Sequence, residues 1–194
     1  NKPLPFKGWK SKYTQITKDN PKGNLTSAAT APGIIKAMRH VNDKMGHIKT
    51  IVVDDWQYMS SFEYFDRANE KGYEKFTQIA ANLAQVAKLP KDLRDDLTII
   101  FLTHSEDSTD INGNRKIKAK TVGKMIDNTL TLEGLFSIVL FGKVNKNDDG
   151  ELEYGFETQN NGENTCKSPM GMFEDKFIPN DLQFVKDCIE KYNQ

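Results

Sequence analysis

The sequence predicts a single α/β domain over residues 1–194, in which a mainly parallel sheet is flanked by helices and extended by a C-terminal antiparallel hairpin. Two apolar runs, at 49–54 and 97–103, have the composition of strands buried on both faces, as in a parallel sheet. A helical pattern precedes each run, at 32–45 and 73–88. This alternation is typical of α/β proteins, and a chain of 194 residues is long enough to bury one core.

The N-terminal half begins with little periodicity, so residues 1–30 are expected to be irregular. The helix at 32–45 ends before Gly46, because glycine is favoured just beyond a helix end. The helix at 73–88 carries an apolar stripe at helical spacing, and Pro90 interrupts it. Each helix therefore has both a buried face and an end signal.

The C-terminal half is expected to contain one further helix–hairpin–helix series. A short helical piece is predicted at 121–127 and a third apolar strand at 136–144. The turn at 147–150, Asn-Asp-Asp-Gly, joins that strand to an alternating partner at 152–158. Asp181 is a favoured N-cap residue, and it opens the last helix.

Composition excludes several classes of protein. The charge is balanced, with 27 basic and 27 acidic residues, so any contact with nucleic acid must come from a local patch. No apolar stretch approaches the roughly 20 residues of a membrane span. Two cysteines are too few for a disulfide scaffold, which favours a reducing, intracellular setting.

Two adjacent carboxylates end the first apolar run. Asp54 and Asp55 repel each other unless a cation or water neutralises them. In a phosphoryl-transfer site Asp54 would orient Mg²⁺ through water while Asp55 aligns the attacking water. The plain alternative is a strand-end turn or a helix cap, where Asp is common. The phosphate-binding sequence G-x-x-x-x-G-K-[ST] occurs nowhere in the chain.

Polar and basic residues follow the second apolar run. If the two runs are neighbouring strands, His104 lies beside Asp54 and can sense a γ-phosphate; the alternative is a histidine bonded to a nearby carbonyl. The segment 106–120 is almost entirely polar and is expected to be a mobile basic loop. It either meets nucleic-acid phosphates or is simply a solvated surface loop. Its relevant cations are Arg115, Lys116, Lys118 and Lys120.

Several segments, taken in their order and spacing, resemble one family. They are Ile51–Tyr58, Glu70–Phe76, Leu93–Leu97, Phe101–Glu106, Lys167–Phe173 and Ile178–Leu182. They are similar to bacteriophage AAA/RecA-like P-loop ATP-binding proteins, which are related to the ATPases of phage single-strand annealing recombinases. The resemblance covers nearly the whole chain.

The resemblance implies a RecA-like ATPase core that binds ATP and Mg²⁺ and acts with single-stranded DNA in phage recombination or replication. Asp54 matches the Walker B acid that holds Mg²⁺, and Asp55 fills the adjoining acidic position. His104 takes the place of the polar sensor, and Lys167 resembles a basic residue that reaches ATP on a neighbouring subunit. The loop 106–120 falls where such proteins contact DNA. The implied setting is the host cytoplasm, with a homo-oligomer and other phage recombination or replication proteins as partners.

The chain departs from that family at its start. Relatives carry the P-loop unit upstream of the region that matches Asn1–Phe6, so we expect ATP and Mg²⁺ to bind only in a form containing that unit. The chain alone is then inactive as an ATPase. One alternative is a non-catalytic nucleic-acid-binding or assembly module on a degenerate RecA-like fold. Another is a Mg²⁺-dependent nuclease in which Glu106 joins Asp54 and Asp55.

Overall fold

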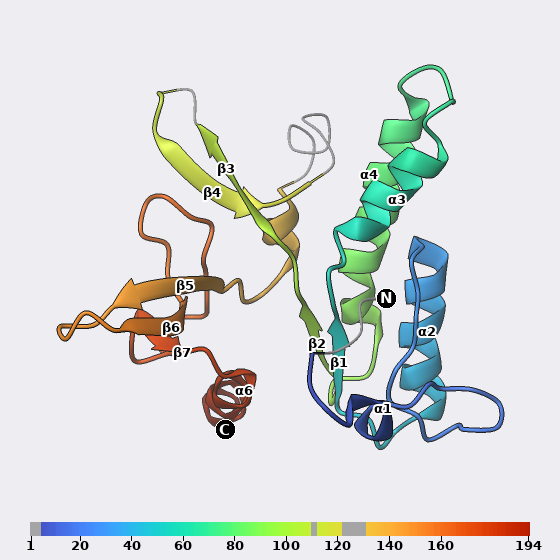
Figure 1. Ribbon diagram of the computed structural model, residues 1–194, viewed down its shortest axis with the longest axis horizontal. Helices are drawn as coiled ribbons and strands as arrows, with labels where there is room; N and C mark the ends of the chain where they lie inside the picture. The colour runs from blue at the N-terminus through green and yellow to red at the C-terminus, as the bar shows by residue number, and fades with distance from the viewer. Residues whose placement is uncertain (1–4, 110–111, 122–130) are drawn as a thin grey trace. The chain divides into compact units, whose positions relative to one another are not determined.

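The computed structural model describes residues 5–109, 112–121 and 131–194 (Figure 1). The chain divides into two compact units, Asn1–Leu102 and Thr103–Gln194. In the described part of the chain, no helix has the length and apolar content needed to cross a bilayer. The helical piece predicted at 121–127 lies outside the described residues, apart from Thr121.

The first unit confirms both predicted helices. Thr30 caps the first of them by accepting a hydrogen bond from the Gly33 amide at 3.3 Å. The aromatic stretch near residue 60, to which the sequence assigned no structure, is also helical. The elements are α1 (Trp9–Lys12), α2 (Ala31–Lys44), β1 (Thr50–Val53), α3 (Tyr58–Asp66), α4 (Glu74–Lys88), the 3-10 helix η1 (Leu89–Asp92) and β2 (Thr98–Phe101).

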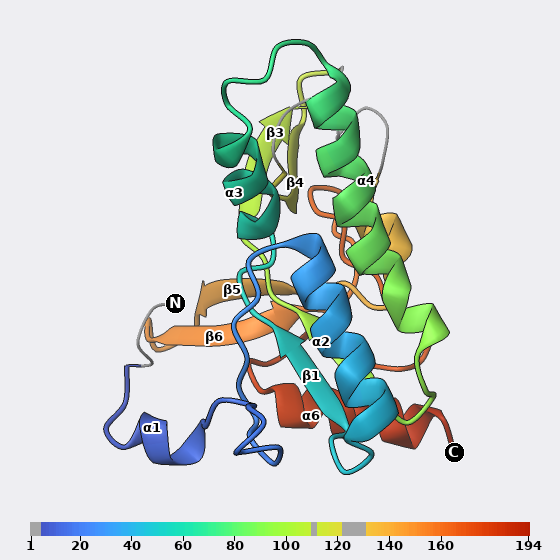
Figure 2. The ribbon, with the colours of Figure 1, turned by 90° about the vertical axis from the view of Figure 1, so that its right-hand side faces the viewer.

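Helix α4 is the central packing element of this unit. It contacts both α2 and α3, which meet it along different parts of its length (Figure 2). Its stripe of Ile79, Leu83 and Val86 is almost completely buried. A second apolar cluster joins Val41 near the end of α2 to residues of β1 and β2. The helical periodicity seen in the sequence therefore marks the faces that bury apolar surface.

The two apolar runs form neighbouring strands, which was the condition for placing His104 after the strand beside Asp54. Strands β1 and β2 pair in parallel, with Thr50 opposite Thr98 and Val53 opposite Phe101. The expected RecA-like fold with a mainly parallel sheet is nevertheless wrong, because among the described residues this parallel sheet contains only two strands. Its strands are not buried on both faces either, since Val52 is 50% exposed. An apolar run shows that a strand forms but not how many neighbours it finds.

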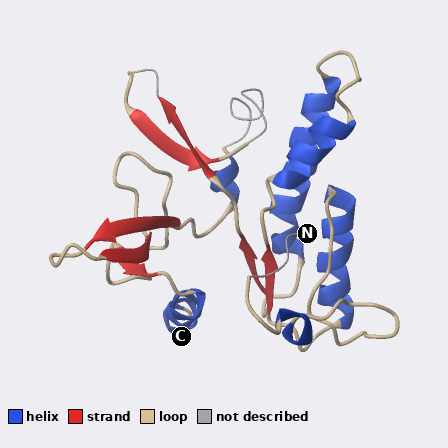
Figure 3. Ribbon diagram, in the orientation of Figure 1, coloured by secondary structure: helices blue, strands red, loops and turns tan. Residues whose placement is uncertain are grey.

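The second unit is built from antiparallel sheets (Figure 3). The predicted turn at 147–150 joins two paired strands, and the predicted cap at Asp181 accepts hydrogen bonds from the amides of Gln183 and Phe184. The elements are β3 (Ser105–Thr109), β4 (Arg115–Ala119), the 3-10 helix η2 (Leu132–Leu135), β5 (Phe141–Lys146), β6 (Leu152–Glu157), β7 (Phe177–Pro179) and α6 (Leu182–Tyr192).

Two expectations for this unit need correction. The segment expected to be a mobile loop, 106–120, lies largely in the antiparallel hairpin β3–β4. The predicted antiparallel hairpin forms as β5 and β6, but it does not extend the parallel sheet, because β5, β6 and β7 make a separate antiparallel sheet. The hairpin turn after β5 brings β6 back alongside it, so β5 joins an antiparallel sheet.

One guanidinium connects the helix before β1 to the start of β2. Arg94 donates from Nη1 to the carbonyls of Val41 and Asn42 at 2.9 and 3.1 Å, and from Nη2 to the carbonyl of Ile48. Its Nε donates to Asp96 at 2.7 Å. Lys49 also bonds Asp96 and, together with Arg94, holds the pKa of that carboxyl below its usual value. The end of α2, the turn before β1 and the entry to β2 are thereby fixed together.

We expect Arg94→Lys to destabilise this unit by about 2–3 kcal/mol, because an ammonium cannot reproduce the planar fork and leaves partly buried carbonyls without donors. Urea denaturation followed by circular dichroism measures the loss. Lys91→Gln is the control, since Lys91 is exposed and its substitution should stay within about 0.5 kcal/mol. Equal stability of the two variants would contradict the role given to Arg94.

The two thiols should react at very different rates. Cys166 is buried, and that burial raises its pKa to about 11, whereas Cys188 is partly exposed. At pH 8 roughly one Cys166 in a thousand is then a thiolate, and the thiolate is the reactive form. Titration of the native protein with a disulfide reagent should show one fast and one slow thiol. Cys166→Ser should remove the slow phase alone, and two fast thiols would contradict the burial of Cys166.

Candidate functional site

The turn that follows β1 is tied to the end of β2. The Val53 carbonyl accepts from the Leu102 amide at 3.0 Å, and the Trp56 amide donates to the Leu102 carbonyl at 3.2 Å. The ring of Trp56 meets that of Phe101 edge-on, with centroids 5.0 Å apart. These contacts hold the turn across the carboxyl ends of both parallel strands, the place where ligands bind in open α/β sheets.

The two predicted acids differ in conformation and exposure. Asp54 is exposed, and it makes no hydrogen bond or ion pair with another described residue. Asp55 is partly buried and has φ of 52°, which makes it the one non-glycine residue with positive φ in the described chain. Such a conformation costs on the order of 1–3 kcal/mol and is common at functional sites. The backbone therefore turns sharply at the second acid.

Gln57 is a polar residue of this turn that the sequence interpretation did not single out. It is 7% exposed, and its Oε1 atom has no hydrogen-bond partner among the described residues. A buried acceptor without a donor costs about 1–3 kcal/mol, so such atoms are rare in folded proteins. The sequence offered one clue to the burial of Gln57. Its amide side chain lies in a short stretch with the apolar residues Trp56 and Met59, and both of these are buried.

The other two predicted nucleotide-site residues, His104 and Lys167, belong to the second unit. His104 is exposed, and its carbonyl accepts from the Lys120 amide at 2.8 Å, just before β3. Lys167 is partly buried, and its backbone forms an antiparallel bridge with Val139. Their proposed roles toward a nucleotide at Asp54 stay predictions.

The cations predicted to bind nucleic acid lie on or beside the β3–β4 hairpin and are largely engaged within their own unit. Arg115 pairs with Asp107 at 2.8 Å, and this hydrogen bond raises the pKa of Arg115. Lys118 pairs with Glu106 at 3.4 Å. Lys116 Nζ donates to the Gly162 carbonyl. The hairpin therefore carries much less uncompensated charge than its basic residues alone suggest.

The acids at the turn offer a limited set of metal ligands. In the described residues no group of three or more His, Cys, Asp or Glu side chains is arranged to hold a metal ion. Carboxylate oxygens suit Mg²⁺, which keeps several waters and is often held by one or two carboxylates together with phosphate oxygens. The exposed carboxylate of Asp54 is of the kind that suits this role.

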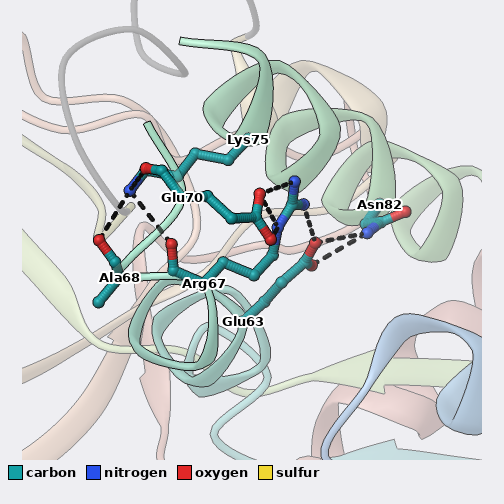
Figure 4. Close-up of polar contacts among 6 residues, drawn as sticks. All are labelled: Glu63, Arg67, Ala68, Glu70, Lys75 and Asn82. Atoms are coloured by element: carbon teal, nitrogen blue, oxygen red, sulfur yellow. Dashed lines mark hydrogen bonds and ion pairs between the residues drawn. The ribbon is translucent and has the colours of Figure 1, made fainter. Parts of the chain in front are cut away.

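A second polar cluster lies between α3 and α4 (Figure 4). Lys75 is buried, and its Nζ donates to the carbonyls of Arg67, Ala68 and Glu70 at 2.9–3.4 Å. Arg67 pairs with Glu63 at 3.0 Å and with Glu70 at 2.7 Å, which lowers the pKa of Glu70. Because the charged groups of this cluster are paired with one another or with backbone carbonyls, the cluster closes the helical hairpin and offers no free group for chemistry.

Comparison with models of known protein families, with curated proteins and with solved structures found no match. The function of this chain must therefore be argued from its own residues. The turn after β1 is the feature that best supports such an argument, because exposure, backbone strain and a buried unpaired acceptor meet within four residues.

We expect Asp55→Gly to stay within about 1 kcal/mol of the parent protein and Asp55→Val to lose about 1–3 kcal/mol, because valine disfavours a left-handed backbone. Chemical denaturation measures both free energies of unfolding. At Asp54, where φ is negative, the order should reverse, with the glycine variant the less stable one. The same order at both positions would contradict the conformation of Asp55.

Proposed function

We propose that this protein provides the Mg²⁺ and water side of an ATP-hydrolysing site, in a phage recombination or replication protein that acts with single-stranded DNA. The observation that carries the proposal is the acidic turn: Asp54 is exposed at the carboxyl end of a parallel strand, and Asp55 follows it in a strained conformation. Parallel strand ends are where phosphoryl-transfer proteins place the acid that orients the metal.

The two acids have different tasks in this proposal. Asp54 faces solvent, so its carboxylate can hold water molecules of a hydrated Mg²⁺ in a fixed direction. When bound, Mg²⁺ neutralises charge that develops on the phosphate oxygens. Asp55 accepts a hydrogen bond from the attacking water and fixes its line of approach. The 194 residues hold no G-x-x-x-x-G-K-[ST], so phosphate-binding donors come from another segment or subunit.

The segments that resemble phage ATP-binding proteins are a second support, because they include the acidic turn itself. In this proposal His104 is the polar sensor of the γ-phosphate, and Lys167 reaches a nucleotide held by a neighbouring copy in a homo-oligomer. Both assignments follow the resemblance residue by residue. Because β1 and β2 form a two-stranded sheet, the roles of His104 and Lys167 must be tested without assuming a RecA-like core.

A non-catalytic nucleic-acid-binding or assembly module is the second candidate function. It is favoured by one observation, the absence of a phosphate-binding loop sequence from these residues. It differs from the first candidate in a measurable way: its DNA affinity would be independent of nucleotide, and substitution of Asp54 would change nothing but local stability.

We expect a form of the protein that contains a phosphate-binding loop to hydrolyse ATP with Mg²⁺ and single-stranded DNA, and Asp54→Asn to lower kcat of that form at least about 100-fold, since about 2.7 kcal/mol of transition-state stabilisation is lost. A coupled phosphate-release assay measures turnover. Asp95→Asn is the control, because Asp95 is an exposed acid of the same unit.

Two results would count against this function. Unchanged turnover in the Asp54→Asn variant would remove Asp54 from the site. We expect the 194-residue chain alone to hydrolyse ATP only at the background rate. Strong hydrolysis by this chain would show that the phosphates of ATP are held by a means other than a P-loop.

A further inference from the structure

We propose that the exposed face of α2 is a binding surface for single-stranded DNA. An open groove of about 570 Å³ runs along this helix, and its polar lining consists of Lys36, Arg39, His40, Asp43 and Lys44 together with Gln85 of α4. We call it the α2 groove. The proposal rests on the proposed function only for the choice of single-stranded DNA as the polyanion.

The spacing along the helix arranges the cations in rows. Lys36, His40 and Lys44 follow one another at intervals of four residues, so they lie on one face with a rise of about 6 Å between neighbours. Arg39 lies beside this row, three residues after Lys36. All four side chains are exposed. A row of this kind can meet successive phosphates of a strand that runs along the helix.

The groove carries a net positive charge. The basic side chains of Lys36, Arg39 and Lys44 face the single carboxylate of Asp43, which accepts a hydrogen bond from Asn42 Nδ2 at 2.8 Å. None of the three cations forms an ion pair or hydrogen bond with another described residue. The β3–β4 hairpin is the contrast, because Arg115 and Lys118 there are paired with acids. The described hairpin cations are thus mostly engaged within their own unit, whereas the basic side chains of α2 are not.

The rest of the helix argues for nucleic acid rather than a membrane surface. The apolar face of α2, formed by Ile34, Met38 and Val41, is buried in the protein and cannot enter a lipid layer. Pro32 and Ile35 give the groove an apolar portion against which sugars and bases can lie. No Phe, Tyr or Trp side chain lines the groove, so binding should depend mainly on phosphate charge and show little sequence preference.

Fluorescence anisotropy with a labelled oligothymidine of about 20 nucleotides tests the proposal, at several salt concentrations and without nucleotide. The triple variant Lys36→Gln, Arg39→Gln, Lys44→Gln removes the charge of the groove. A matched triple variant, Lys116→Gln, Lys118→Gln, Lys120→Gln, removes the same charge from the hairpin. Circular dichroism confirms that both variants are folded.

We expect the groove variant to bind DNA at least about 10-fold more weakly and to lower the slope of log affinity against log salt by about 2–3, as for three lost phosphate contacts. The hairpin variant should lose less than about 3-fold. Equal losses in the two variants, or a larger loss in the hairpin variant, would overturn the proposal. Displacement of the DNA by polyglutamate as readily as by unlabelled DNA would also overturn it, in favour of an acidic protein partner.

The Asp54→Asn variant separates this inference from the proposed function. It should bind DNA as the parent does, because Asp54 lies outside the α2 groove. If DNA binding depends on α2 but a form that contains a phosphate-binding loop never hydrolyses ATP, the proposed function alone is overturned. ATP hydrolysis that depends on Asp54, with DNA affinity unchanged in the groove variant, would overturn the α2 surface alone.

Discussion

The arrangement of the first unit depends on the guanidinium of Arg94. It binds carbonyls at the end of α2 and before β1, and its salt bridge with Asp96 lies two residues before β2. These three points define where β1 begins and which residue of β2 it meets. A shift of one residue in that register would turn every side chain of a strand to the other face. Asp54 directly follows β1. Its position therefore depends on the contacts that Arg94 makes at the other end of that strand.

The sequence predicted the elements whose signals are local. The helices α2 and α4 carry complete apolar stripes, and the hairpin β5–β6 has its own turn residues. The extent of the parallel sheet could not be predicted in this way, because the composition of β1 does not record how many strands pair with it. The sequence did not predict helix α3, because its apolar residues do not form one stripe that could be buried. Phe62 and Phe65 are exposed in the structure.

The candidate site was predictable in position but not in conformation. Asp54 could be placed at a strand end from the sequence, whereas the left-handed backbone of Asp55 and the buried amide of Gln57 are properties of the folded turn. The hairpin β3–β4 shows the same limit for charge. Its strands contain few apolar residues, and the acids of β3 are paired with cations of β4. Composition counts the cations, but only the strand register shows which of them an acid neutralises.

The two faces of α2 differ in what they present. The inner face contributes Val41 to the apolar cluster against which Ile51 of β1 packs, and Arg94 fixes the end of the helix to the turn before that strand. The outer face carries the cations of the α2 groove. Protein interiors are close-packed and transmit strain, so a DNA strand bound on the outer face would act on the packed helix as a whole. The proposed DNA surface and the acidic turn therefore belong to one packed element pair, α2 and β1, rather than to a mobile loop added to a nucleotide site.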